Sequence, residues 1–278
     1  MTAVYHQPTR LEEALSLVAQ GAVPVAGATG LYSAKTRPQG AMVDLAGLGL
    51  ETIAVEAGRI ALGATVTLSQ IADSELPGME GALLRRGARS VASRPMRNVV
   101  TVGGNLAHLA FWADMPVVLL ALDAVVETRH AGQAAILKPL ADCFKGGVPW
   151  EGGLITRVMV PLRQGAQGFG HERFSRTAND YSLATACATL RRDGAVARDV
   201  RLVIGALQPR PFRLPDVEKM AEGQALEAAL LARIETAVRE RVQVAPNFRA
   251  SPEYRRELAG TLARRALLDA FSWAMREN

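Results

Sequence analysis

The sequence predicts an α+β fold, because strand-like and helix-like stretches occur together along the whole chain. Residues 52–63 alternate apolar and polar side chains and predict a β-hairpin. Residues 190–207 predict a second hairpin, with Asp193 and Gly194 at its turn. Residues 251–276 repeat apolar side chains at helical spacing behind a capping serine, and they predict a long helix.

The remaining elements are short and mixed in order. Residues 8–20 predict a helix with Thr9 as its N-cap, ended by Gly21. A charge-poor, glycine-rich loop is expected over residues 164–170. Further strands are expected at 22–26, 42–45, 124–128 and 152–161, and further helices at 67–76, 79–91, 116–122 and 216–242, the last broken near Gly223.

A length of 278 residues allows a sizeable core and more than one subdomain. The glycine-rich stretch at 164–170 interrupts the pattern of strands and helices, so we place a domain boundary there. We expect one domain over residues 1–165, with subdomains of about 1–55 and 56–165, and a second domain over residues 170–278.

Composition excludes several classes of protein. The net charge is +5, but the arginines are spread along the chain, which does not favour a nucleic-acid binder. Two cysteines without a CxxC motif exclude an iron–sulfur cluster or a cysteine-rich zinc site held by this chain alone. We find no signal peptide and no apolar run long enough for a membrane span, and we expect a soluble cytoplasmic protein.

The most informative stretch is TVGGNLAHLAFWADMP, at residues 101–116. Gly103 and Gly104 follow a strand-like pair, so backbone N–H groups there could approach an anion without an intervening Cβ. The amide of Asn105 adds hydrogen bonds, and the carboxylate of Asp114 could accept them from sugar-like hydroxyls. The stretch is a candidate cradle for a phosphate or diphosphate; taken alone, a paired glycine is more often a plain turn.

The string RNVVTVGGNLAH…AD, from Arg97 to Asp114, resembles the second flavin motif of the FAD-binding (medium) subunits of molybdenum hydroxylases. Members of this family include carbon monoxide dehydrogenases, xanthine dehydrogenases and aldehyde oxidoreductases. The family's first motif, A-G-G-T/H-x-L, is similar to the sequence from Ala26 to Leu31. Ala28 stands where the family has a second glycine, and Gly30 stands where it commonly has serine or aspartate.

Similar segments continue along the chain, at residues 116–126, 152–161, 173–181 and 251–267, so the resemblance covers residues 5 to 270. It implies a two-subdomain FAD-binding domain of the vanillyl-alcohol-oxidase (PCMH-like) type, followed by an α+β C-terminal domain of the carbon monoxide dehydrogenase flavoprotein type.

The resemblance implies an FAD-binding electron-transfer subunit of a molybdenum-containing hydroxylase or dehydrogenase. Its partners would be a small subunit with [2Fe-2S] clusters and a large molybdopterin subunit, in a doubled heterotrimer. Electrons would leave through FAD to NAD, oxygen or a quinone. Two alternatives stay open: a stand-alone flavin-dependent oxidase, and a non-catalytic remnant that has lost FAD.

The resemblance also implies which residues bind the cofactor, and it implies neither a catalytic residue nor a metal ligand on this chain. His108 is not assigned a catalytic acid/base role, because the family's motif commonly carries this histidine and electron transfer through a flavin needs no imidazole. Phe111 and Trp112 depart from the small or proline residues usual in the family, and they could cover the flavin or pack on a partner chain. The implied cofactor-binding residues are Ala26, Gly27, Ala28, Thr29, Gly30, Thr101, Val102, Gly103, Gly104, Asn105, Asp114, Ile155, Arg173 and Tyr181.

Four of these residues have a plain structural alternative. Asp114 could be the N-cap of the helix that follows it. Tyr181 could be a core tyrosine, Arg173 a surface arginine, and Ile155 an ordinary residue of a core strand.

Overall fold

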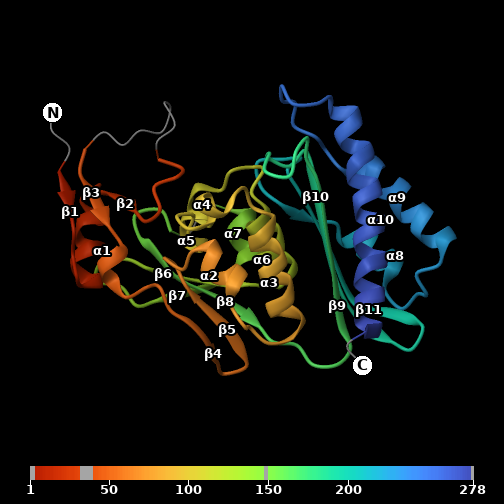
Figure 1. The fold of residues 1–278 in the computed structure, drawn as a ribbon, viewed down its shortest axis with the longest axis horizontal. Coiled ribbons are helices and arrows are strands. Elements are labelled where there is room, and N and C mark those ends of the chain that lie inside the picture. The colour runs from red at the N-terminus through yellow and green to blue at the C-terminus, as the bar shows by residue number, and fades with distance from the viewer. Residues whose placement is uncertain (1–3, 32–39, 147–149, 277–278) are drawn as a thin grey trace. The chain divides into compact units, whose positions relative to one another are not determined.

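The computed structural model describes residues 4–31, 40–146 and 150–276 (Figure 1). The chain forms two compact units that interleave in sequence, and the linear boundary expected near residue 165 stays a prediction. Within the described residues, no helix is both long and apolar enough to cross a bilayer. Unit 1 comprises Met1–Ser74, Ser93–His108 and Asp123–Pro161, and unit 2 comprises Glu75–Ala92, Leu109–Leu122 and Leu162–Asn278.

Unit 1 begins with a small parallel sheet in the order β1-β3-β2, covered by helix α1. The apolar face of α1, including Ala14 and Leu15, packs on Val43. The helix was predicted, but Thr9 is not its cap: Arg10 occupies the N-cap position and makes no side-chain capping bond. The elements are β1 (Tyr5–His6), α1 (Leu11–Ala19), β2 (Val23–Val25) and β3 (Met42–Asp44).

A five-stranded antiparallel sheet completes unit 1, in the order β4-β5-β8-β6-β7 (Figure 1). The predicted hairpin is confirmed, because β4 and β5 pair around a tight turn at Ala57 and Gly58, both with positive φ. The strands are β4 (Ile53–Glu56), β5 (Arg59–Gly63), β6 (Val125–Arg129), β7 (Ile136–Pro139) and β8 (Leu154–Pro161).

Short helices connect these strands. Thr67 caps α2 in a reciprocal capping box with Gln70, as its hydroxyl position predicts. The strand expected before the paired glycines is wrong: Thr101 forms only an isolated bridge with Thr67, and a helix starts at Val102. The helical elements of this unit are η1 (Ala46–Leu48), α2 (Leu68–Asp73), α4 (Arg94–Arg97), α5 (Val102–His108) and α7 (Leu140–Lys145).

Unit 2 is built on an antiparallel sheet in the order β12-β11-β10-β9. The loop expected over 164–170 is wrong from residue 167 onward, because β9 starts there. Gly168 and Gly170 are strand residues that let α10 approach: an added Cβ would lie 2.0 Å from the carbonyl oxygen of Ala270 or Ala266. The strands are β9 (Gln167–Phe174), β10 (Ala184–Asp193), β11 (Val196–Gly205) and β12 (Phe212–Arg213).

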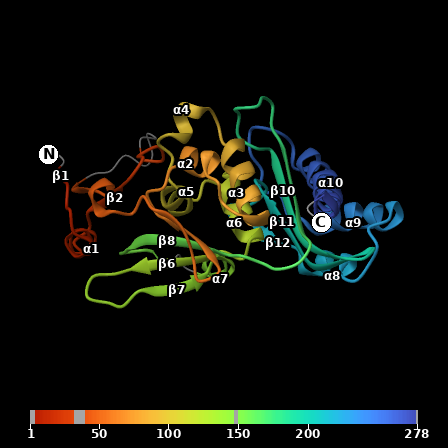
Figure 2. The same ribbon diagram turned by 60° about the horizontal axis from the view of Figure 1, so that its bottom comes forward.

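Strand β10 presents two different faces. Ala184, Ala186 and Ala188 belong to the apolar core shared with α10, whereas the alternate residues Thr185 and Thr189 bond to helix α6. The sheet of unit 2 is therefore covered on both faces, as Figure 2 shows. The helices of this unit are α3 (Gly78–Ser90), α6 (Asp114–Ala121), α8 (Pro215–Ala221), α9 (Ala228–Arg241) and α10 (Pro252–Arg276).

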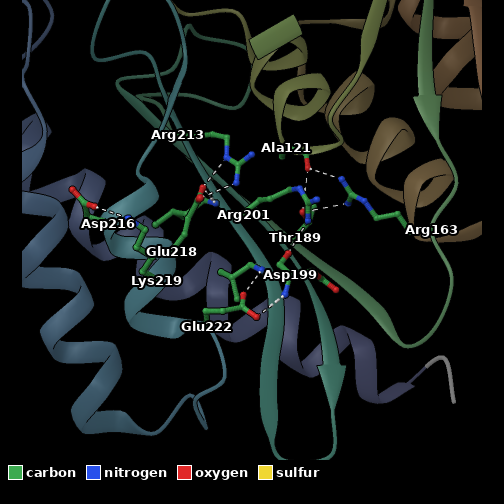
Figure 3. A network of polar contacts seen from close by, with 12 residues as sticks. Ala121, Arg163, Thr189, Asp199, Arg201, Arg213, Asp216, Glu218, Lys219 and Glu222 are labelled. Atoms are coloured by element: carbon green, nitrogen blue, oxygen red, sulfur yellow. Dashed lines mark hydrogen bonds and ion pairs between the residues drawn. The ribbon is translucent and has the colours of Figure 1, made fainter. Parts of the chain in front are cut away.

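Helix α6 is fixed at both of its ends by β10. At its C-terminal end, the carbonyl oxygen of Ala121 accepts hydrogen bonds from the Thr189 hydroxyl at 3.1 Å and from Arg163 Nη2 at 3.3 Å (Figure 3). At its other end lies Asp114, whose carboxylate bonds to Thr185. All eight residues of α6 are buried, so these polar contacts replace the water that its terminal groups would otherwise bind.

Candidate functional site

The turn at residues 26–30, directly after β2, has open backbone donors. Among the described residues, the N–H groups of Gly27, Ala28 and Thr29 donate to no acceptor. Ala28 has φ of 58°, in the left-handed region. Successive N–H groups around a left-handed residue form a concave anion-binding nest, so this turn has the geometry to bind a phosphate.

Two glycines bring this turn against the second motif. A Cβ on Gly27 would lie 1.5 Å from the carbonyl oxygen of Val99, and a Cβ on Gly30 would lie 2.7 Å from Cγ of His108. Neither position has room for a side chain. The two motifs, far apart in sequence, thus meet within unit 1.

The second motif uses its glycines differently. The N–H of Gly103 donates to the carbonyl of Ala64 at 2.9 Å, and the N–H of Gly104 donates to the Thr101 hydroxyl at 3.1 Å. The N–H groups of Val102 and Asn105 are also paired within the protein. The interpretation of these glycines as an N–H cradle is therefore corrected: acceptors on Ala64, Val66 and Thr101 already take these N–H groups. Any contact of residues 101–105 with a ligand stays a prediction, and it would involve side chains or the exposed surface of Gly104.

One atom of the second motif has no partner. Asn105 Oδ1 is buried, and no hydrogen bond reaches it within the described chain. Buried polar atoms are almost always hydrogen-bonded in folded proteins, so an unpaired amide oxygen here is an observation that a ligand would explain.

Asp114 lies in unit 2 at the centre of a buried polar cluster. It is 4% exposed, and its Oδ1 accepts hydrogen bonds from the hydroxyls of Ser182 and Thr185, both at 3.0 Å. Its Oδ2 lies 3.2 Å from Nε of Arg173 and accepts a longer bond from Ser90. The N-cap alternative is wrong, because Ala113 is the N-cap and the carboxylate bonds to the sheet instead.

Arg173 is half-buried rather than a surface arginine, with a side chain 17% exposed. Besides Asp114, its guanidinium donates to the Ser182 hydroxyl at 3.0 Å and to the backbone carbonyls of Ala178 at 3.2 Å and Asp180 at 2.7 Å. The arginine therefore holds the segment that carries Tyr181.

His171 lies on the neighbouring strand and is buried, with no partner for its Nε2 in the described chain. Burial is the main cause that lowers the pKa of His171 to about 4. The negative charge of Asp114 acts in the opposite direction, whereas the positive charges of Arg86 and Arg173 lower the pKa further. The ring is thus neutral near pH 7.

Tyr181 is not a core tyrosine, because it is 47% exposed. Its ring lies 4.5 Å from that of Trp112, which in turn meets Phe111 edge-on at 4.6 Å, measured between centroids. The guanidinium of Arg249 lies 4.6 Å from the Tyr181 ring. This row presents a partly exposed aromatic surface.

Asp180 is hydrogen-bonded to two members of this group, the backbone N–H of Tyr181 and the guanidinium of Arg249. Hydrogen bonds from Arg176, from the N–H of Tyr181 and from Arg249 lower the pKa of Asp180 to about 2. The carboxylate is therefore charged at any physiological pH, which keeps Arg249 in place.

Residues 1–163 match the family model described as the FAD binding domain in molybdopterin dehydrogenase, and residues 171–270 match that of the CO dehydrogenase flavoprotein C-terminal domain. The chain belongs to this FAD-binding family. The predicted family, the FAD cofactor and the assignment to oxidoreductase subunits are thereby confirmed.

The chain is similar to several curated members. It is 30% identical over 94% of its length to the 6-hydroxypseudooxynicotine dehydrogenase complex subunit alpha of Paenarthrobacter nicotinovorans, covering 91% of that protein. It is 29% identical to the glyceraldehyde dehydrogenase medium chain of Sulfolobus acidocaldarius, with 74% of each chain covered.

The predicted fold class is confirmed by a solved structure. Reconstituted CO dehydrogenase from Oligotropha carboxidovorans matches with a TM-score of 0.91 at 25% identity, covering 98% of this chain and 99% of that one.

The residues of unit 1 fit part of the FAD molecule that this family binds. The open donors at 27–29 suit its diphosphate, and glycines at 27 and 30 let this turn pack against Val99 and His108. Ile155 gives no such sign: it is 6% exposed in β8 and pairs with Thr128, which is the position of a core residue.

Sequence reasoning missed several members of the cluster around Asp114, namely Ser90, Ser182 and Thr185. For Thr185 a signal was present at residues 184–189, ATACAT, where alanine alternates with threonine or cysteine. Such alternation predicts a strand with one polar face, and a polar face on a buried strand requires a partner.

Proposed function

We propose that this chain is the electron-transfer subunit of a molybdenum-containing hydroxylase, working in the cytoplasm. The observation that carries the proposal is the turn at Gly27–Thr29, whose three open N–H groups suit a diphosphate in a chain of an FAD-binding family. When bound, FAD supplies a redox centre that accepts electrons one at a time and delivers them singly or in pairs.

In this proposal the backbone donors of Gly27, Ala28 and Thr29 hold the diphosphate. Ala26 and Gly30 border the turn, and the unpaired Oδ1 of Asn105 in helix α5 can accept a hydrogen bond from a hydroxyl of the same ligand. A neutral, backbone-lined site of this kind binds two negative charges through dipoles that are already oriented, so little reorganisation accompanies binding.

The residues of unit 2 have supporting roles in the proposal. Tyr181 offers a half-exposed ring suited to a planar partner, and Arg173 fixes the segment around it. Asp114 orients Arg173 through their buried ion pair. The predicted direct contacts of Asp114, Arg173 and Ile155 with FAD stay predictions.

The proposed partners are a small subunit with two [2Fe-2S] clusters and a large molybdopterin subunit, in a doubled heterotrimer. Support comes from relatives that are named as the medium chain of a dehydrogenase or as a subunit of a dehydrogenase complex. Substrate would be oxidised on the large subunit, and its electrons would reach this chain through the clusters. They would then pass to an external acceptor, which is NAD, oxygen or a quinone.

A spectrum and a reduction experiment test the function. The purified complex should contain one acid-releasable FAD per copy of this chain, bleached by substrate and restored by the physiological acceptor, with NAD, oxygen and a quinone compared. A colourless chain that takes up no FAD would overturn the proposal. Substrate turnover by this chain with FAD and oxygen alone, without partners, would favour a stand-alone oxidase instead.

A further inference from the structure

His108 stands beside the open turn, although the proposed function gives it no role. Its ring fills the space that a side chain at position 30 would otherwise take: a Cβ on Gly30 would lie 2.7 Å from its Cγ and 2.8 Å from its Nδ1. The ring therefore packs directly against the last residue of the turn.

The imidazole is exposed and unsatisfied. The His108 side chain is exposed, and neither of its ring nitrogens has a hydrogen-bond partner within the described residues. A neutral imidazole carries one N–H donor, and a protonated one carries two. A free donor therefore lies against a turn whose own N–H groups at 27–29 are also free.

Helix α5 presents a second polar group on the same side. Asn105 precedes His108 by three residues, a spacing that places both on one helix face. The buried, unpaired Oδ1 of Asn105 shows that this face is polar but unsatisfied by the protein. One face of α5 and one turn thus concentrate unpaired hydrogen-bonding groups at a single place in unit 1.

We propose that His108 is a binding residue for the diphosphate, donating a hydrogen bond from its imidazole to a phosphate oxygen held by the turn at 27–29. The inference rests on the proposed function, because it takes that diphosphate to belong to FAD. The glycine at position 30 admits the ring, so Gly30 and His108 act as one unit.

The affinity of the flavin-depleted protein for FAD tests the proposal, with riboflavin, which has no phosphate, as a second probe. His108→Ala should weaken FAD by about 10- to 100-fold, the effect of losing a hydrogen bond to a charged group, and should leave riboflavin unchanged. His108→Gln, which keeps an N–H donor, should recover part of the affinity. His130→Ala, in the turn between β6 and β7, is the matched control and should bind FAD normally.

A double-mutant cycle separates binding from packing. Gly30→Ala should displace the ring and weaken FAD by itself, but it should add little to His108→Ala, because the ring is then absent. Additive losses, equal losses for FAD and riboflavin, or an FAD affinity of His108→Ala within twofold of wild type would overturn the inference. A wild-type protein that binds no FAD would instead contradict the proposed function.

Discussion

The turn at residues 27–29, which contains Gly27, and the start of α5 at residues 102–105, which contains Gly103 and Gly104, use their backbone in opposite ways. The first leaves its N–H groups open around a left-handed alanine. The second directs every N–H to a protein acceptor and uses Gly103 to pack against Ala64. A pair of glycines therefore does not identify an anion site; what identifies one is whether each backbone N–H already has an acceptor within the protein.

Asp114 resembles the start of α5 in this respect, because its carboxylate is already bonded to protein groups. Replacing it by alanine leaves the Arg173 guanidinium buried without its carboxylate, so the free energy of unfolding should fall by about 3–5 kcal/mol. Urea denaturation measures this loss. Asp142→Ala, which removes an exposed ion pair with Lys145, should cost about 0.5 kcal/mol or less. A stable Asp114→Ala protein with weak FAD binding would show that Asp114 contacts the ligand instead of stabilising the fold.

Acid should destabilise the cluster through His171. Its pKa is about 4 in the folded protein against an ordinary value of 6.5, so between these values the unfolded chain binds the proton and the folded chain does not. Stability is complete above pH 6.5 and falls as the pH drops toward 4, by up to about 1.4 kcal/mol per pH unit from this group.

His171→Gln should flatten that part of the pH profile, measured by urea denaturation at several pH values. His6 is only partly buried, so His6→Gln serves as the control substitution in the same measurement. Parallel profiles for wild type and His171→Gln would remove His171 from the account.

Gly103→Ala tests whether Gly103 serves the packing of α5 against Ala64 rather than ligand binding. The new methyl group would lie 2.7 Å from Cβ of Ala64, so we expect a loss of about 1–3 kcal/mol in stability. FAD affinity of the folded protein should change little. Adding Ala64→Gly should restore part of the stability, and the absence of any such coupling would show that the two residues do not meet.

The smallest expected effect concerns Ala28. A left-handed alanine costs about 1–2 kcal/mol, whereas glycine costs about 0.5–1 kcal/mol in chain entropy, so Ala28→Gly should raise stability by about 0.5 kcal/mol. Thermal unfolding would detect it. Ala54→Gly, in strand β4, has no strain to relieve and should destabilise; equal effects at both positions would argue against the left-handed turn.

The sequence predicted the strands, hairpins and long helix because their apolar periodicity and turn residues are local signals. The sequence-based prediction failed where a glycine is needed for packing against a segment that is distant in sequence. Gly168 and Gly170 look like a loop until α10 is seen against them, and Gly103 looks like an anion turn until Ala64 is seen beside it. Close approach between distant segments leaves no trace in local pattern.

Within the candidate site, the two motifs were predictable and their chemistry was only partly so. The resemblance to the family motif drew attention to Ala28, and the structure shows why a glycine would suit this position, because φ is positive there. The roles of Ser182, Thr185 and Arg249 depend on pairings with Asp114 and Asp180 across 68 or more residues, which no local spacing reveals.

Amide chemical shifts in isotopically labelled, flavin-depleted protein test the central claim most directly. On titration with FAD, and separately with ADP, the N–H resonances of Gly27, Ala28 and Thr29 should shift strongly, whereas that of Gly103, already bonded to Ala64, should shift little. Large shifts at Gly103 with unmoved resonances at 27–29 would contradict the account.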